Sequence, residues 1–276
     1  MVNGGPENHW CGVPAGCDPG LVLSQDEIGR FVADGFVAVR GAIPPEMTGA
    51  CQDAIWAELA GHGVRRDDPG TWTEPVVRIV TPDSPPFVAA GGTALVGEAC
   101  DQLLGPGRWI RHPGVGGTTP VRFPSPADPG DAGWHIEASY SDAHGPRVNV
   151  RSRGRGMLAL YLFTDVGPDD APTRIRPGSH RDVPPILAPA GDDGLDWPTA
   201  AQRAVAASAH RPTVRATGQA GDVFLCHPFL VHAASWPHHG RSPRMMAQPP
   251  VLLTDGQFPL PIARPSPPTP VEQAMS

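Results

Sequence analysis

Hydrophobic residues recur at helical spacing near the start of the chain and gather into short β-like runs farther on. Ser24 and Glu27 form a capping-box pattern, in which each side chain satisfies a backbone amide of the other. Ile28 and Phe31 follow at helical spacing, and the pattern breaks at Gly35. The sequence therefore predicts a short helix that begins after Ser24 and ends near Gly35.

A strand over residues 36–40 and a second helix opened by the Pro-Pro-Glu sequence at 44–46 come next, followed by a helical segment near residues 93–104. The other strand-like runs span residues 72–80, 108–111, 119–123, 134–139, 157–163, 173–176, 212–216, 223–227 and 245–253. About eight strands after Trp72, with few intervening helices, favour a mainly β fold, a closed or double-sheet architecture such as a jelly roll. The helices are expected to flank and buttress the sheets.

Three polar segments read as loops. Residues 124–132 and 141–156 are expected to flank the mouth of a site, while residues 177–198 form a long Pro/Gly/Asp insertion of the kind that often serves as a lid. A short helix is expected over residues 199–209. The prolines after Asp255 predict a tail that does not fold.

The chain is accordingly divided into an N-terminal extension (1–22), one domain (23–254) and a Pro-rich C-terminal tail (255–276). A single domain suits the length of 276 residues, and 33 Gly and 36 Pro suit short strands joined by turns. No internal repeat is present.

Charge and cysteine content exclude several classes of function. A net charge of −7 without a basic run argues against nucleic acid as a partner. All 21 basic residues are Arg, so Schiff-base lysine chemistry is excluded. The 5 cysteines form no C-x-x-C pair, which disfavours both a disulfide framework and a zinc ribbon. With neither a targeting segment nor a long apolar run in the sequence, the expectation is a soluble, cytoplasmic protein without a membrane partner.

Metal-ligand chemistry is the strongest functional signal. His135 and Glu137 are two residues apart on a predicted strand, so their side chains point the same way, and His232 can supply a second imidazole. Two His and one carboxylate leave the remaining coordination positions of a metal free. Non-haem Fe(II) oxygenases use this arrangement to bind an organic co-substrate and dioxygen.

The motifs, taken in order, resemble the phytanoyl-CoA dioxygenase family of Fe(II)/2-oxoglutarate oxygenases from about Leu23 to Leu253. The resemblance rests on Asp34-Gly35-Phe36 followed by Gly41, on Trp134-His135-Ile136-Glu137, on the segment from Ala171 to His180 (APTRIRPGSH), and on Gly221-Asp222-Val223 leading to His227-Pro228 and His232. Each motif alone would be weak, and only the combination is specific.

The resemblance implies a double-stranded β-helix, or cupin-like jelly roll, with Fe(II) held by His135, Glu137 and His232. It also implies that 2-oxoglutarate chelates the iron beside the O2 site while its distal carboxylate pairs with Arg244. Physical chemistry supports Arg244 separately, because a buried carboxylate needs a charge-assisted partner and the planar guanidinium provides one. Arg244 also enters an apolar strand, which predicts an inward position.

Two positions depart from the family pattern. The usual motif is His-x-Asp, whereas this chain has Glu137, which is longer by a methylene but still an anionic oxygen ligand. Ala234 stands where Ser is frequent, so one hydroxyl contact to 2-oxoglutarate would be missing.

Other residues near the motifs have less specific interpretations. Arg122 either faces the co-substrate or substrate or is solvated. His227 is interpreted as a structural residue at a strand end and His180 as a residue that stabilises its loop. Trp134 is expected to pack in the core and Asp222 to cap a turn.

The implied activity is oxidation of a C–H bond, with hydroxylation as the default and desaturation, epimerisation or cyclisation as variants. No adenine-binding signature supports a CoA ester, so the expected substrate is a free small molecule of the specialised-metabolite class. The four Arg between 147 and 155 either attract an anionic substrate or belong to a solvated loop. The alternatives are a zinc hydrolase or isomerase at the same triad and a binding protein without turnover. The sequence leaves the oligomeric state open.

Overall fold

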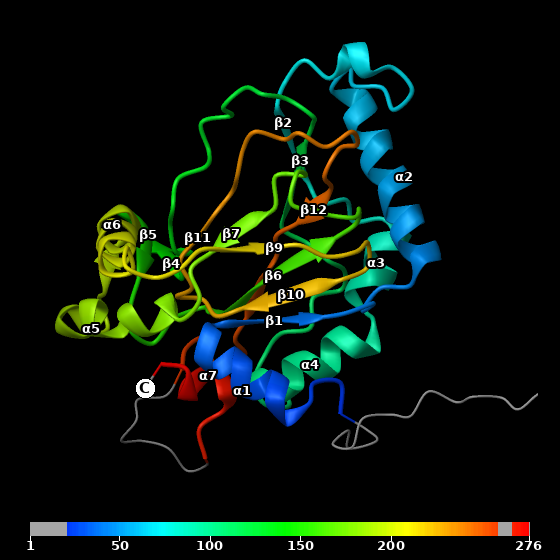
Figure 1. Cartoon of the computed structure of the whole chain (residues 1–276). Helices are drawn as coiled ribbons and strands as arrows, with labels where there is room; N and C mark the ends of the chain where they lie inside the picture. Colours follow the sequence, from blue (N-terminus) through cyan, green and yellow to red (C-terminus); the bar gives the residue numbers. More distant parts are fainter. Residues whose placement is uncertain (1–20, 259–266, 276) are drawn as a thin grey trace, which may run out of the picture.

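All strand pairs in the protein are antiparallel in a computed structural model that describes residues 21–258 and 267–275 (Figure 1). The strands are β1 (Phe36–Val39), β2 (Val76–Val80), β3 (Thr118–Arg122), β4 (Tyr140–Asp142), β5 (Gly145–Val148), β6 (Arg155–Leu162), β7 (Thr173–Ile175), β8 (Leu195–Asp196), β9 (Val214–Ala216), β10 (Val223–Cys226), β11 (His232–Ala233), β12 (Met246–Ala247) and β13 (Pro250–Leu252).

Helices cover a larger part of the described chain than strands do. They are α1 (Gln25–Asp34), α2 (Pro45–Gly61), α3 (Pro85–Gly91), α4 (Ala94–Leu104), α5 (Pro184–Leu187), α6 (Trp197–Ala207) and α7 (Pro270–Gln273), with 3-10 turns η1 (Pro69–Thr71), η2 (Ser179–Asp182) and η3 (Ala188–Ala190). The expectation of a mainly β fold with flanking helices is therefore confirmed in part, because the helices take up more of the chain than expected. Antiparallel sheets with flanking helices are confirmed.

The largest sheet has the order β1-β10-β6-β12, with β13 also paired to β6. Arg122 at the end of β3 exchanges both main-chain hydrogen bonds with Arg244, at 3.0 and 2.8 Å, just before β12. This pair links the two-stranded sheet β2-β3 to the large sheet. A second sheet, β11-β7-β9, and a third, β4-β5-β8, complete the architecture.

Strand β6 shows why the large sheet is covered on both faces. Alternate residues such as Met157 and Tyr161 pack in one core with helical residues, whereas Leu158 and Leu160 pack in another core with Ile175 of β7. Because side chains alternate along a strand, a run that is apolar at every position requires burial on both sides. The large sheet therefore lies between a helical layer and the sheet that carries His232.

Helix α1, the first element of the helical layer, begins and ends where the sequence patterns predict. Ser24 caps α1, its hydroxyl accepting from Glu27 N while the Glu27 carboxylate accepts from Ser24 N, and Gly35 ends the helix at φ 85°. Helix α7 packs against α1 and α4 beneath β1 (Figure 1). Val271 of this helix and Ala274, the residue just after it, are fully buried. The prediction of an unfolded tail was thus wrong for these residues, because they supply apolar surface to the helical core.

Several predicted strands and loops differ in the structure. Residues 134–139 and 108–111 form isolated bridges instead of ladder strands. The expected loop 141–156 contains β5 and most of β4, and the insertion 177–198 contains α5 with two 3-10 turns and β8. Residues 1–20 of the expected N-terminal extension lie outside the described residues, and the proposed boundary of the domain stays a prediction.

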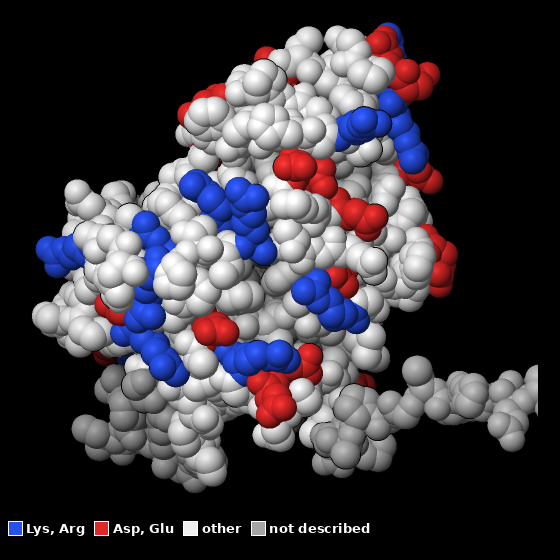
Figure 2. Space-filling model, viewed as in Figure 1, with Lys and Arg blue, Asp and Glu red and all other residues white. Residues whose placement is uncertain are grey.

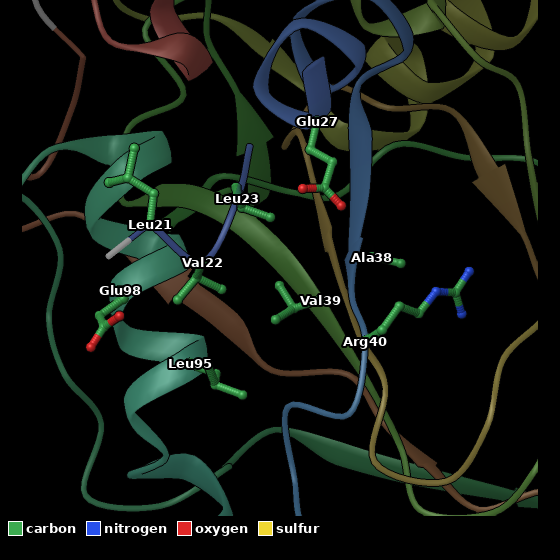
Figure 3. A pocket seen from close by; sticks show the side chains of 9 residues that line it. All are labelled: Leu21, Val22, Leu23, Glu27, Ala38, Val39, Arg40, Leu95 and Glu98. Carbon is green, nitrogen blue, oxygen red and sulfur yellow. The ribbon is translucent and has the colours of Figure 1, made fainter. Parts of the chain in front are cut away.

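A cavity of about 460 Å³ lies between the segment Leu21–Leu23, β1 and α4 (Figure 3). Its walls are mostly apolar, with Glu27, Arg40 and Glu98 also facing it. None of its lining residues belongs to the predicted metal triad, so this cavity is not the predicted metal site.

Two expectations concern the whole molecule. No helix among the described residues is long and apolar enough to cross a membrane. The described cysteines, Cys51, Cys100 and Cys226, are all free and buried, and burial raises the pKa of each thiol to about 12. Their environment is that of inert core residues.

Candidate metal centre and co-substrate site

His135 and His232 are brought together by a reciprocal main-chain pair. His135 N donates to His232 O at 2.9 Å, and His232 N donates to His135 O at 3.0 Å. His232 also pairs with Ile175 of β7. The segment around His135 therefore extends the β11-β7-β9 sheet by a single bridge, and the two imidazoles lie side by side with ring centroids 4.5 Å apart.

Each imidazole is oriented by a backbone carbonyl two residues before it. His135 Nδ1 lies 2.9 Å from Gly133 O, and His232 Nδ1 lies 2.9 Å from Leu230 O. A carbonyl only accepts, so each Nδ1 carries the hydrogen and each Nε2 keeps its lone pair. This tautomer is the one in which Nε2 can bind a metal.

Glu137 completes the triad. Its Oε1 lies 3.4 Å from His232 Nε2, and the ligating atoms of His135, Glu137 and His232 all lie within 4.8 Å of one another. Ile136 between the two ligands is fully buried in a separate apolar cluster. His135 and Glu137 thus point to one side and Ile136 to the other, as in a β-strand, although the segment forms no ladder with a neighbouring strand.

The electrostatics of the triad favour a cation. Burial alone would raise the pKa of Glu137, but contacts with His232 and Arg155 lower it to about 2. Burial, together with His232, lowers the pKa of His135. Glu137 is therefore an ionised carboxylate beside His135, whose protonated form burial disfavours, and its negative charge would stabilise a metal ion among the three ligating atoms. Two nitrogens and one oxygen suit Fe(II).

Arg244 is the largest fully buried side chain of the described residues, with 1% exposure. One guanidinium nitrogen donates to Ala171 O at 2.6 Å, and Nε has no hydrogen-bond partner. Burial, with repulsion from Arg122, lowers the pKa of Arg244 to about 9, so the group remains charged at neutral pH. A buried cation with unused donors fits the carboxylate of a bound organic acid.

Arg122 is buried as well, which rules out the solvated alternative. It donates to Asp131 Oδ2 at 2.6 Å, and Arg78 forms an ion pair with the same oxygen. Arg122 Nε and Asp131 Oδ1 lack partners. Asp131 also interacts electrostatically with both His135 and Arg244, so this carboxylate influences both the triad and the buried arginine.

The remaining sequence interpretations can be compared with the structure. His227 is fully enclosed beside His180, at 5.0 Å between ring centroids, and accepts from Phe229 N. Asp222 caps its turn by accepting from Gln219 N, and it also accepts from Gly41 N and Arg40. Trp134 is only partly buried and lies against the guanidinium of Arg176 and that of Arg174, so core packing describes it incompletely.

Sequence reasoning missed two residues that contact the site. The sequence indicated no role for Asp131 beyond its place in the predicted loop 124–132. Arg155 was interpreted as one of four arginines that either attract an anionic substrate or are exposed to solvent. Arg155 Nη2 instead lies 3.3 Å from Glu137 Oε2. No spacing in the sequence indicates either contact, because each joins segments that meet only in the folded chain.

Comparison with known proteins agrees with the geometry. A sequence profile of the phytanoyl-CoA dioxygenase (PhyH) family matches residues 31–246. No curated protein was found to match the sequence. Similar solved structures include SnoK, a non-heme alpha ketoglutarate dependent carbocyclase from nogalamycin biosynthesis, at 17% identity and a TM-score of 0.56 over 84% of both chains.

Two further structures have the same fold. EctD from S. alaskensis, solved with 2-oxoglutarate and 5-hydroxyectoine, is 19% identical with a TM-score of 0.56, covering 90% of this chain and 83% of that chain. HygX from Streptomyces hygroscopicus, solved with nickel and 2-oxoglutarate, is 16% identical with a TM-score of 0.53, covering 82% and 86%.

Fold and family together define the class of protein as an Fe(II)/2-oxoglutarate-dependent dioxygenase. The chain belongs to the phytanoyl-CoA dioxygenase family, since the profile match spans well over half its length. Family membership decides against the zinc hydrolase or isomerase. The candidate metal triad in turn argues against the other alternative, a binding protein without turnover.

Proposed function

We propose that this dioxygenase oxidises an unactivated C–H bond of a free small molecule. 2-Oxoglutarate serves as co-substrate and leaves as succinate and CO2. The observation that carries the proposal is the triad His135, Glu137 and His232 together with a fully buried Arg244, since Asp131 interacts electrostatically with both His135 and Arg244. A hydrolytic metal site has no need of that buried guanidinium, whereas a dicarboxylate co-substrate does.

The residues divide the work by chemistry. His135, Glu137 and His232 would hold Fe(II), and Arg244 would bind the distal carboxylate of 2-oxoglutarate. Bound iron supplies the activation of dioxygen that oxidative cleavage of a C–H bond requires. The Gly133 and Leu230 carbonyls keep the two imidazoles in the tautomer that exposes Nε2.

Arg122 is proposed as a second residue of the co-substrate site, next to Arg244. Its main chain is joined to that of Arg244, and its guanidinium pairs with Asp131. The two guanidinium groups repel each other, and Asp131 offsets part of that repulsion. An incoming carboxylate would reduce it further, so binding of a dicarboxylate relieves an unfavourable interaction within the protein.

Structures of the same fold support a small specialised metabolite as substrate. HygX has been solved with hygromycin B, and SnoK acts as a carbocyclase in nogalamycin biosynthesis. Hydroxylation is the default outcome for this chain, with desaturation, epimerisation or cyclisation as variants. The catalytic domain is proposed to span residues 23–254, and its buried free thiols fit a reducing compartment such as the cytoplasm.

The test is anaerobic addition of Fe(II) and 2-oxoglutarate to metal-free protein, followed by visible absorption spectroscopy. Chelated 2-oxoglutarate is expected to give a weak charge-transfer band that diminishes in Glu137→Ala and in Arg244→Ala. Arg203→Gln, a variant on the exposed face of α6, serves as a matched control and should keep the band. Folded, iron-loaded wild type without a band would refute the proposal.

A further inference from the structure

Arg155, the first residue of β6, makes two contacts with the segment that carries the carboxylate ligand. Its Nε donates to Ala138 O at 2.9 Å, and its Nη2 lies 3.3 Å from Glu137 Oε2. The Arg155 side chain is 16% exposed and that of Glu137 is 25% exposed. The arginine thus holds both the backbone just after Glu137 and the carboxylate itself.

The backbone around Arg155 keeps the two segments close. Gly154 has φ 86°, and a Cβ atom there would lie 2.9 Å from Ser139 O, so only glycine allows this approach. Ser139 N donates to Arg147 O at 2.9 Å. The guanidinium therefore reaches Glu137 from a supported position and not from a free loop.

The two oxygens of Glu137 face different partners. Oε1 lies toward His232 Nε2, and Oε2 lies toward Arg155. Glutamate has one more rotatable bond than the aspartate usual in this family, and its carboxylate can bind a metal through one oxygen or through both. A cation that occupies Oε2 restricts it to one.

We propose that Arg155 is a positioning residue that keeps Glu137 a single-oxygen ligand. The inference rests on the proposed function. An octahedral metal bound by one atom from each of His135, Glu137 and His232 has three positions left, two for 2-oxoglutarate and one for dioxygen. A second oxygen from Glu137 would take one of them. Arg155 thus protects the co-substrate position without touching the metal.

The proposal predicts opposite effects on metal and co-substrate affinity. In Arg155→Gln a positive charge beside the metal is lost, so Co(II) should bind as well as in wild type or more tightly. The released Glu137 oxygen should compete with 2-oxoglutarate. The Kd of 2-oxoglutarate for the Co(II)-loaded protein is therefore expected to rise about tenfold, the scale of one charge-assisted hydrogen bond.

The experiment measures both affinities by calorimetry under anaerobic conditions and records the visible spectrum of bound Co(II). Arg155→Lys keeps the charge but not the fork, so it should fall between wild type and Arg155→Gln. Arg153→Gln is the matched control, because Arg153 lies in the same loop over the Tyr140 ring and contacts no triad residue in the described structure.

The outcomes separate the possible failures. Unchanged 2-oxoglutarate affinity in folded Arg155→Gln, or a loss of Co(II) affinity as large as the loss of 2-oxoglutarate affinity, would overturn the positioning role. Wild-type Co(II) protein that does not bind 2-oxoglutarate would instead refute the proposed function. A thermal melt of each variant shows whether it is folded. If Arg155→Gln does not fold, the 2-oxoglutarate affinity of Arg155→Lys tests the proposal in its place.

Discussion

Replacement of Arg244 by Met separates the stability of the protein from its affinity for 2-oxoglutarate. Met has a similar length and no charge, so the variant removes the burial penalty of the guanidinium and its repulsion with Arg122. It also leaves Ala171 O without the donor now 2.6 Å away. An unsatisfied buried carbonyl costs about 1–3 kcal/mol. These terms oppose each other, so the free energy of unfolding should change by less than about 2 kcal/mol.

Co-substrate binding should respond much more strongly. A bidentate pair between Arg244 and a carboxylate consists of two charge-assisted hydrogen bonds, each worth about 1.5–3 kcal/mol. Loss of about 3 kcal/mol corresponds to a rise of more than 100-fold in Kd. Metal affinity should stay unchanged, because no triad residue contacts the Arg244 side chain among the described hydrogen bonds and ion pairs.

The assay is an anaerobic titration of Co(II)-loaded wild type and Arg244→Met with 2-oxoglutarate, beside urea denaturation of both metal-free proteins. Arg244→Lys adds a charged control that lacks the planar fork and should recover only part of the affinity. A Kd within about threefold of wild type for a folded Arg244→Met protein would refute the assignment of this residue to the co-substrate.

Three further predictions concern stability. Burial lowers the pKa of His180 to about 4 and that of His227 well below its ordinary 6.5. As the pH falls, these histidines therefore take up protons in the unfolded chain before they do so in the folded protein. The free energy of unfolding should be constant above pH 6.5 and should fall as the pH drops toward 4, by up to about 1.4 kcal/mol per pH unit for each histidine. His180→Gln should flatten that slope in urea denaturation at stepped pH, and an unchanged slope would contradict the reasoning. Val271→Ala should cost about 1.5–2.5 kcal/mol by thermal denaturation, since Val271 is fully buried in α7, and no loss would mean that α7 does not dock. Asp131→Ala should cost about 2–4 kcal/mol in the same assay because Arg122 loses its carboxylate partner inside the protein, whereas a neutral effect would show that solvent replaces the pair.

Local patterns were read correctly where the interactions that form an element lie within a few residues. The capping box at Ser24 and the left-handed Gly35 bound α1 as expected, because both act through hydrogen bonds to the next turn. The apolar run of β6 likewise predicted a strand. Segment 134–139 failed as a ladder strand because its pairing depends on β11, which the local sequence does not specify.

The sequence by itself determined the identity of the metal ligands proposed here, since His135, Glu137 and His232 are the residue types that such chemistry needs and the motifs occur in the family order. The tertiary structure decided which groups surround them. Asp131 reaches Arg122, and Arg155 reaches Glu137, across chain separations that no local pattern records. Such contacts exist only after the sheets have packed, because closing the intervening loops costs entropy that only the assembled core repays.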